Sequence, residues 1–349
     1  MSVASVSHLT VRYGSRPVIN DLNLKIPEGC VGLLGHNGAG KTTLIKTLLG
    51  FLKPAAGTGQ VLDMDIASQG MQIRQRIGLM PEIDCHIPGM NAVTFVSYAG
   101  ELAGMPASAA LSRAHEVLEY CGLGEARYRN VETYSTGMKQ RIKLAQALVH
   151  GPKLVFLDEP TNGLDPAGRD EMLALVRDLS HGKGVNVIVS SHLMPDIEQT
   201  CDHVIVLNRG QIARNGTLAE LRATEGVEVE VELRFASDPF VEAMRRRGAE
   251  VLHTFGSNIR FGFSRPTVTA ETSPEEASDR AIQASRGNSS ALASNASDNG
   301  SELDQHIAQI TAGTIGRQLF EAARESGAQV RGFRLAQRSL EDVFVESAE

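Results

Sequence analysis

The sequence is poor in aromatic residues. It has no tryptophan, and aromatic residues make up only 5% of its 349 positions. A platform of aromatic rings for stacking nucleic-acid bases is therefore not expected. Basic residues are not in excess either, since 34 Lys and Arg stand against 41 Asp and Glu, for a formal net charge of -7. This balance argues against nucleic acid as the main partner.

The sequence also lacks signals for membrane insertion or secretion. No stretch approaches the roughly 18 unbroken apolar residues that a membrane-spanning helix needs. Residues 1–4 have neither the basic nor the apolar region of a secretory signal. Cysteine is scarce, and Cys30, Cys85, Cys121 and Cys201 show no paired metal-ligand spacing. We expect reduced thiols in a cytoplasmic protein, and Cys85 with His86 is not expected to bind metal without a second pair.

The chain does have enough apolar residues, 42% of the total, for more than one core, and its length predicts about two domains. Residues 1–225 are expected to form an α/β domain. Strand patterns occur at 3–11, 18–26, 31–34, 153–157, 185–190, 201–207 and 211–215, and helical patterns at 42–49, 101–121 and 137–149. The second helical pattern is broken at Gly104, Met105 and Pro106. The strands at 153–157 and 185–190 are continuously apolar, which predicts burial on both faces of a sheet.

Residues 226–349 have a different pattern and are expected to form a small C-terminal domain. Strands are predicted at 227–235, 251–255, 258–263 and 329–336, helices at 239–247 and 314–325, and a last helical turn or two at 340–346. The order βαββαβ is that of a split βαβ unit, which is an α+β domain. Between its halves, residues 265–301 are rich in Ser, Asn and Gly, and this composition predicts a disordered loop.

A glycine-rich loop follows the strand at 31–34 and opens a helix. It consists of Gly35, His36, Asn37, Gly38, Ala39, Gly40, Lys41, Thr42 and Thr43. Glycines allow the backbone to curl until successive N–H groups converge on phosphate oxygens, and the helix adds its positive N-terminus. Lys41 can bridge the terminal phosphates, and the Thr42 hydroxyl suits Mg²⁺. The alternative of a chance glycine-rich turn does not explain why strand, loop and helix occur in this order.

Two further polar groups end apolar strands. Asp158 and Glu159 close one strand, and because adjacent strand residues face opposite sides, they can have two different tasks. Asp158 can hold the Mg²⁺ shell, while Glu159 can orient and deprotonate the attacking water. His192 closes the strand at 185–191 and can reach a terminal phosphate. Carboxyl ends of strands are where ligands bind in such sheets, although each group alone could be a solvated strand end.

A turn with Ser135 and Gly137, followed by Lys139, Gln140 and Arg141, has no obvious task in the pocket of the first loop. We interpret this turn as the second part of a nucleotide site that is shared with another subunit. The sequence therefore predicts a nucleotide hydrolase that closes and opens with ATP.

Taken in order, these motifs resemble the nucleotide-binding subunits of ATP-binding cassette (ABC) transporters, over about residues 3–220. The resemblance implies a P-loop NTPase cassette with a mixed sheet core and a helical subdomain at about 83–150. It also implies that residues 35–43 are the Walker A loop and 154–158 the Walker B strand, with Glu159 as catalytic base and His192 as switch histidine. Tyr13 would stack on adenine, and the less favoured alternative is a turn tyrosine beside Gly14.

The resemblance further implies that the site is shared between subunits. Ser135 and Gly137 would bind the γ-phosphate of ATP held by the other subunit, and Asp165 belongs to a loop that crosses to the partner. The expected cofactors are ATP and Mg²⁺. The expected partners are a second ATPase subunit, identical or related, and a separate transmembrane permease that places the chain at the cytoplasmic face of the membrane.

The sequence departs from the family pattern at two places. Tyr134, Thr136 and Met138 replace the usual Leu, second Gly and Gln of the signature turn. Glu82 stands where the family has a Gln that contacts Mg²⁺ and the permease. Its oxygen can bind a metal, but an ionised carboxylate cannot donate a hydrogen bond. Together with the closing residues 340–344, these features resemble the ABC-2 group, which consists mostly of exporters.

The sequence also bears on three other functions. A soluble ABC-type ATPase acting on ribosomes or DNA usually has two cassettes or a long coiled-coil insertion, which this chain lacks. A regulatory module with little turnover would not need Glu159 and His192, and a P-loop kinase leaves the signature turn unexplained. The C-terminal domain could stabilise a dimer or act as a sensor. The cargo, and whether the ATPase pair is homodimeric, do not follow from the sequence.

Overall fold

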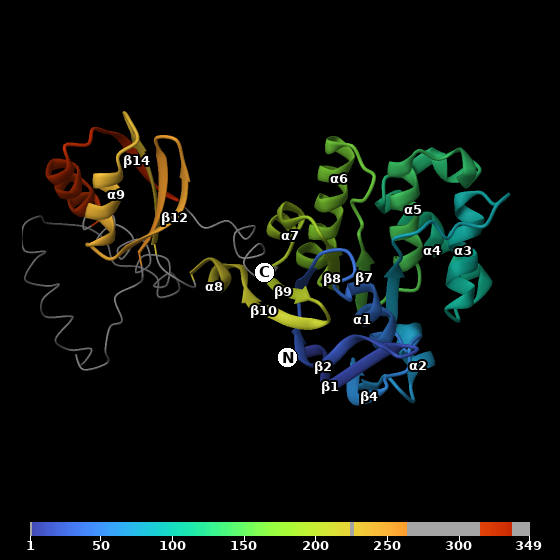
Figure 1. Cartoon of the computed structure of the whole chain (residues 1–349). Coiled ribbons are helices and arrows are strands. Elements are labelled where there is room, and N and C mark those ends of the chain that lie inside the picture. Colours follow the sequence, from blue (N-terminus) through green and yellow to red (C-terminus); the bar gives the residue numbers. More distant parts are fainter. Residues whose placement is uncertain (1, 224–226, 264–314, 337–349) are drawn as a thin grey trace, which may run out of the picture. The chain divides into compact units, whose positions relative to one another are not determined.

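The structure is a computed structural model that describes residues 2–223, 227–263 and 315–336 (Figure 1). The predicted loop at about 265–301 and the helical turn predicted at 340–346 lie outside the described residues. The described chain falls into two compact units, one ending at Arg222 and the other beginning at Ala223. No helix in the described parts of the chain combines the length and hydropathy that crossing a membrane requires.

The centre of the first unit is a six-stranded mixed sheet. Its order is β10 (Gln211–Thr217), β9 (His203–Asn208), β3 (Cys30–Leu34), β8 (Asn186–Ser191), β7 (Leu154–Asp158) and β6 (Ile77–Met80). All neighbours run parallel except β9 and β10. Along β7, Leu154 and Phe156 belong to one buried cluster, while Val155 and Leu157 belong to another. Both faces are thus covered, which explains the continuous apolar run.

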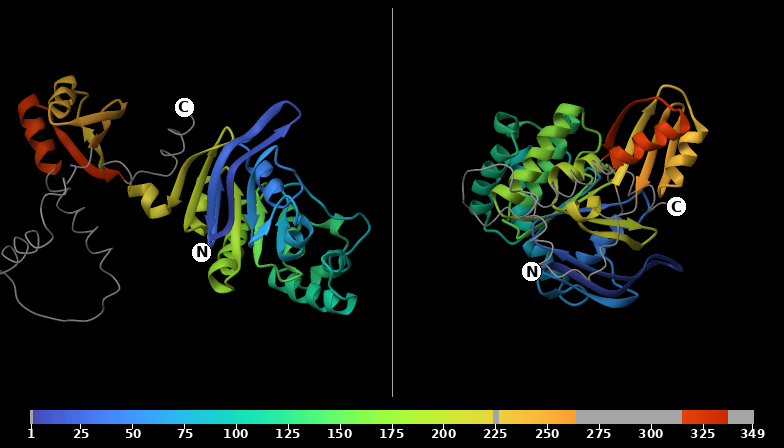
Figure 2. Two further views of the ribbon diagram at one scale, coloured as in Figure 1. Left: turned by 90° about the horizontal axis from the view of Figure 1, so that it is seen from below. Right: turned by 90° about the vertical axis from the view of Figure 1, so that its left-hand side faces the viewer.

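One face of this sheet is covered by helix α1 (Lys41–Leu48) and a second, antiparallel sheet. That sheet has the order β2 (Arg16–Pro27), β1 (Ser2–Tyr13), β4 (Ala56–Val61) and β5 (Met64–Asp65). Leu44, Ile45 and Leu48 of α1 share one buried cluster with side chains of both sheets. Figures 1 and 2 show α1 lying between them. Because α1 is buried in this way, the loop before it has a fixed position at the carboxyl end of β3.

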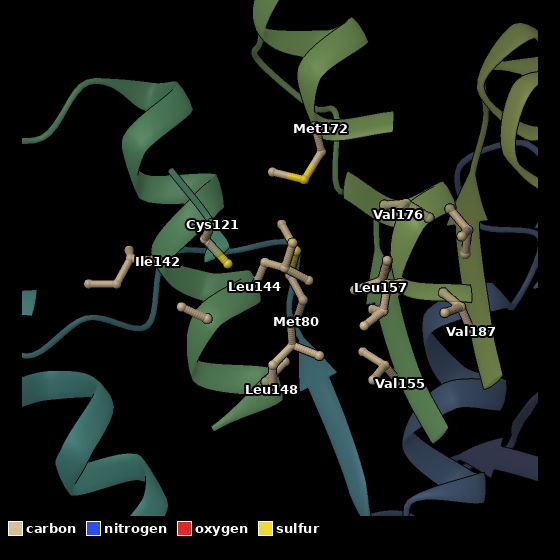
Figure 3. Packing of buried hydrophobic residues seen from close by; sticks show 14 of the residues in the cluster. Met80, Cys121, Ile142, Leu144, Leu148, Val155, Leu157, Met172, Val176 and Val187 are labelled. Atoms are coloured by element: carbon tan, nitrogen blue, oxygen red, sulfur yellow. The ribbon is translucent and has the colours of Figure 1, made fainter. Parts of the chain in front are cut away.

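The other face is covered by helices. They are α3 (Ala92–Leu102), α4 (Ala107–Tyr120), α5 (Thr136–Leu148), α6 (Pro166–Arg177) with a π-helical continuation (Asp178–Gly182), and α7 (Met194–Thr200). Leu144 and Leu148 of α5 pack with Met80 of β6 and with Leu157 of β7, and Met172 of α6 joins the same cluster (Figure 3). The signature turn at Ser135 is therefore anchored through α5 to the strand that ends in Asp158.

Most predicted elements of this unit are present with bounds shifted by a few residues. The main difference is α3, which starts at Ala92 and not at 101. Its start has a local cause, because the side chain of Asn91 accepts a hydrogen bond from Thr94 N at 2.9 Å. The predicted break is confirmed, since α3 ends before Gly104, which has a φ of 98°, and α4 begins after Pro106.

Several elements were missed in the sequence. They are β4, β5, β6, α2 (Gly70–Arg76), α6, α7 and the short helices at Gly124–Tyr128, Val131–Thr133 and Leu218–Ala223. Strand β6 has only four residues, which is too short for a periodic pattern. Helix α6 did carry a signal, because Asp165 caps it by accepting from Gly168 N and Pro166 occupies its first position.

The second unit has the predicted element order. Strands β11 (Val227–Leu233), β12 (Ala249–Phe255), β13 (Asn258–Phe263) and β14 (Val330–Ala336) form an antiparallel sheet in the order β12-β13-β11-β14, with helices α9 (Asp238–Arg245) and residues 315–326. Val229, Val231 and Phe261 form one core with Phe240 and Leu319. The opposite face of β11 carries glutamates, which explains its Val–Glu alternation. We propose that this unit is an accessory domain.

Candidate functional site

The predicted phosphate loop joins β3 to α1. Gly38 and Gly40 have φ values of 85° and 109°, and Gly40 occupies the N-cap position of α1. A Cβ built on Gly35 would lie 2.5 Å from the carbonyl oxygen of Leu207, so only glycine fits there without a backbone shift. Ala39 and Thr43 are buried, while His36 and Asn37 are exposed. The loop therefore has the backbone form and the helix N-terminus that a phosphate requires.

Lys41 lies within this loop with only 6% of its surface exposed. Its Nζ donates to the carbonyl oxygen of Gly35 at 2.5 Å and lies 3.3 Å from Oε1 of Glu159. The ammonium group is thus held at the centre of the site between the loop and the end of β7. A bound phosphate would compete with Glu159 for this charge.

Asp158 is the last residue of β7, on the same face as Leu154 and Phe156, which is the face toward α1. One carboxylate oxygen accepts from the Thr42 hydroxyl at 3.0 Å, and the other accepts from the Ser190 hydroxyl at 2.5 Å. Asp158 and Ser190 are paired in the β7–β8 register. Strand parity turns Asp158 toward α1, and this brings together the two residues predicted to face Mg²⁺, Thr42 and Asp158.

Glu159 does not continue the strand. Its φ of 51° places it in the left-handed region, and its N–H bonds to the carbonyl of Ser190 at 3.0 Å. Strand alternation is thus the wrong reason for the different directions of Asp158 and Glu159, because a backbone turn separates them. Left-handed conformations of residues other than glycine are costly and cluster at functional sites.

The Glu159 carboxylate is buried and has two neighbours. Oε2 lies 2.8 Å from Nδ1 of His192, and Oε1 is in ion-pair range of Lys41 but accepts no hydrogen bond among the described residues. His192 keeps 39% of its side chain exposed. A buried carboxylate oxygen with unused acceptor capacity, 3.3 Å from the ammonium group of Lys41, is suited to accept a proton from a water molecule.

Ser135 and Gly137 lie elsewhere on the chain. Ser135 caps α5, with its hydroxyl accepting from Met138 N at 3.3 Å, and both it and Thr136 are exposed. A Cβ on Gly137 would meet only Leu164 Cδ2, at 3.8 Å. Packing within this chain therefore does not require glycine at 137, and a Cβ there would find room.

These residues line a separate pocket of about 790 Å³. Asp165 and Gly163 also line it, whereas residues 35–43, Asp158, Glu159 and His192 do not. The structure thus brings together two groups of predicted residues, one around Lys41 and one around Ser135, and it does not join them within one chain.

The departures in the signature turn have local explanations. Tyr134 is buried, and its hydroxyl donates to the carbonyl of Ala126 at 2.6 Å, so the added polar group has a partner. Met138 packs against the core under α5. Gln140, which had no evident task in the sequence, donates from Nε2 to the carbonyl of Asn162 at 2.8 Å. It ties α5 to the segment that follows Glu159.

Glu82 is exposed, and its backbone carbonyl accepts from Lys143 Nζ at 2.8 Å. Burial lowers the pKa of Lys143, which the carboxylates of Asp84, Glu82 and Asp158 oppose. In the described parts of the chain no hydrogen bond joins the Glu82 side chain to Thr42 or Asp158. Among the same residues no group of three His, Cys, Asp or Glu could hold a metal. A role of Glu82 toward Mg²⁺ therefore stays a prediction.

Tyr13 is the last residue of β1, pairs with Arg16 across the Gly14 turn, and is 50% exposed. The strand that follows this turn lies near the phosphate loop, because a Cβ on Gly40 would be 3.5 Å from the carbonyl oxygen of Val18. The ring is thus accessible near the loop. Its stacking on adenine stays a prediction.

A strand–loop–helix phosphate cradle, facing a carboxylate at the end of a parallel strand, defines a P-loop nucleoside triphosphatase. The sequence profile of the ABC transporter family matches residues 19–162. The chain belongs to this family: it is the ATP-binding, ATP-hydrolysing subunit of an ABC transporter. The resemblance predicted from the motifs is thereby confirmed. Subunits of this kind dimerise and work with membrane permeases.

Curated relatives support this assignment. The uncharacterized ABC transporter ATP-binding protein YxlF of Bacillus subtilis is 38% identical over 226 residues, which are 64% of this chain and 74% of that protein. The bacitracin transport ATP-binding protein BcrA of Bacillus licheniformis is 36% identical, over 60% of this chain and 68% of that protein. The daunorubicin/doxorubicin resistance ATP-binding protein DrrA of Streptomyces peucetius is 35% identical, over 64% of this chain and 68% of that protein.

Solved structures share the fold. The cbiO1 protein of Clostridium perfringens, part of the ABC transporter complex cbiONQ, has a TM-score of 0.58 and 26% identity over 64% of this chain and 91% of that one. The ATP-binding cassette MJ0796, solved as a dimer bound to ADP and Pi, has a TM-score of 0.57 and 23% identity. The match covers 62% of this chain and 98% of that one. These similarities confirm the predicted cassette fold.

Proposed function

We propose that two copies of this chain, or one copy and a related ATPase, close around ATP so that each provides the half-site that the other lacks. The observation that carries this proposal is the separation on one chain of the Lys41 group from the pocket lined by Ser135 and Gly137. Glycine at 137 is then explained by the close approach of the partner's bound triphosphate. The γ-phosphate bridges the two subunits, and its loss on hydrolysis lets them open.

Within each site the residues have separate tasks. Lys41 and the loop N–H groups bind the phosphates, and Glu159 accepts the proton of the attacking water while His192 orients its carboxylate. Thr42 and Asp158 offer the hydroxyl and carboxylate oxygens that Mg²⁺ prefers, so the residues present fit this ion. When bound, Mg²⁺ would neutralise charge that develops on the phosphates.

A mixing experiment tests the shared site. Gly137→Asp should abolish turnover by placing a negative charge against the partner's triphosphate, and Lys41→Ala should abolish it by removing the phosphate ligand. Each variant alone is expected to be inactive. A mixture can form dimers in which the intact loop of one chain meets the intact signature turn of the other, so ATPase activity should partly return.

Light scattering with ATP should show dimers in the same mixture, and wild-type protein mixed with buffer serves as the concentration control. If the mixture stays as inactive and monomeric as each variant alone, the two groups do not complete one another.

We also propose that the chain drives export through a separate permease, at the cytoplasmic face of the membrane. The relatives named for bacitracin transport and daunorubicin resistance support this direction. Apolar side chains are exposed between the strand that precedes Glu82 and α4, with Ile83 at 75%, Tyr98 at 41% and Leu102 at 71%. Tyr98 and Leu102 are one turn apart on α3 and share a face. We propose this region as the permease contact.

Replacing Leu102 by Glu should reduce co-purification with the permease at least about five-fold, since burying an unpaired carboxylate at an apolar contact is unfavourable. ATPase activity of the isolated subunit should not change. Leu252→Glu, at a 44% exposed position of the second unit, is the matched control. Equal co-purification of Leu102→Glu and wild type would place the contact elsewhere.

A further inference from the structure

The segment after Glu159 is held by a buried carboxylate that the proposed mechanism does not use. Asp196 of α7 is 1% exposed. One of its oxygens accepts from the Thr161 hydroxyl, and the other accepts from Arg169 Nε at 2.5 Å and pairs with Nη2 of the same side chain. Thr161 is 4% exposed, and Arg169 lies in α6, which is beside α7 (Figure 1).

These contacts close a ring around the catalytic pair. Glu159 bonds to His192 through side chains, and Asp196 follows His192 by four positions on the chain. Asp196 bonds back to Thr161, which follows Glu159 by two positions. Two side-chain hydrogen bonds and two short chain segments thus fix Glu159 and His192 relative to each other. This matters because Glu159 has a left-handed backbone that its surroundings have to maintain.

The same ring is connected to the half-site that faces the partner. Arg169 lies one turn after Asp165, the N-cap of α6. Asn162 is held by Gln140 of α5, five positions after Ser135. The segment 159–165 is thus connected to the signature helix α5 through Gln140, and to Asp196 through Thr161.

We propose that Asp196 is a positioning residue for ATP hydrolysis: it clamps Thr161 and Arg169 and so couples the geometry of the Glu159–His192 pair to the partner-facing loop at Asp165. This inference rests on the proposed function of Glu159. Asp196 does not contact the phosphates, so its loss affects the chemical step and leaves ATP binding in place.

The test compares Asp196→Asn with wild type in steady-state ATPase assays and nucleotide titrations. The amide has one acceptor oxygen and no charge. That oxygen stays with the charged donor Arg169, so Thr161 loses its acceptor. We expect kcat to fall roughly 10- to 100-fold, as for small misplacements of catalytic groups, and KM and ATP affinity to change less than about two-fold. Asp202→Asn removes a carboxylate just beyond the same helix, which pairs with His181, and should leave both parameters unchanged.

Two substitutions of Thr161 form the second pair of variants, because each of them changes only a few atoms of the side chain. Thr161→Val removes only the hydroxyl donor and should reproduce the loss of kcat, while Thr161→Ser keeps the donor and should restore it. The double variant of Asp196→Asn and Thr161→Val should be no slower than Asp196→Asn alone, since both break the same contact. If the Asp196→Asn protein does not fold, the kcat values of Thr161→Val and Thr161→Ser test the inference by themselves.

Wild-type kcat in Thr161→Val, or equal kcat losses in Thr161→Val and Thr161→Ser, overturns the inference. So does a fall in ATP affinity that matches the fall in kcat. Glu159→Gln is measured beside these variants. If it alone hydrolyses ATP normally, the proposed base is wrong. If it is inactive while Thr161→Val is normal, only the clamp is wrong.

Discussion

Replacing Glu159 by Gln should abolish turnover and trap a nucleotide-bound dimer. The amide keeps the size of the side chain but cannot accept a proton at neutral pH, so kcat is expected to fall by about 10²- to 10⁴-fold, as for loss of a general base. ATP binding should persist or tighten, because Lys41 loses the carboxylate 3.3 Å away that competes with phosphate for its charge. Steady-state phosphate release and light scattering with ATP measure the two effects.

The matched control is Glu116→Gln, at an exposed helical position that pairs with Arg113 one turn earlier in α4. It should hydrolyse ATP at the wild-type rate. A Glu159→Gln protein that is as active as this control would remove Glu159 from the reaction. An inactive protein that never forms an ATP-dependent dimer would instead contradict the shared site.

Replacing Lys41 by Ala should remove ATP binding. The ammonium group makes charge-assisted hydrogen bonds, and losing those to the phosphates costs about 3–4 kcal/mol, or roughly 10²- to 10³-fold in affinity. The change also leaves the buried carboxylate of Glu159 without its cation, and this negative charge then opposes the triphosphate. Titration with a fluorescent ATP analogue measures the dissociation constant.

Lys46→Ala is the control, since Lys46 lies in the last turn of the same helix and is exposed. Its affinity for ATP should equal that of the wild type. The same affinity in Lys41→Ala would show that the loop at 35–43 does not hold the phosphates.

The sequence was most informative where function depends on neighbours along the chain. The loop at 35–43 and the pair Asp158 and Glu159 are local motifs, and the two apolar strands behind them predicted burial on both faces. The element order of the second unit was also predictable, because each of its strands and helices has a hydrophobic periodicity that can be recognised locally. Strand β6 and the antiparallel pair β4 and β5 were not, because they are short and are stabilised by contacts with distant strands.

Contacts between distant segments explain what the sequence could not predict about the site. Nothing near Asp196 indicates that it binds Thr161 and Arg169, and nothing near Gln140 indicates its contact with Asn162. The left-handed backbone of Glu159 is likewise imposed by tertiary structure, since isolated glutamate avoids it. Tyr134 was recognised as a departure, but its role required knowing that the carbonyl of Ala126 lies within reach of its hydroxyl.

The placement of both half-sites on one chain has a consequence for symmetry. If each copy presents the same two patches and receives the same two, the pair is related by a two-fold axis and all four patches are consumed. No third copy can add to such a closed assembly, however high its concentration, so the cassette cannot grow into a filament. Its stoichiometry of two nucleotides per pair is then set by geometry.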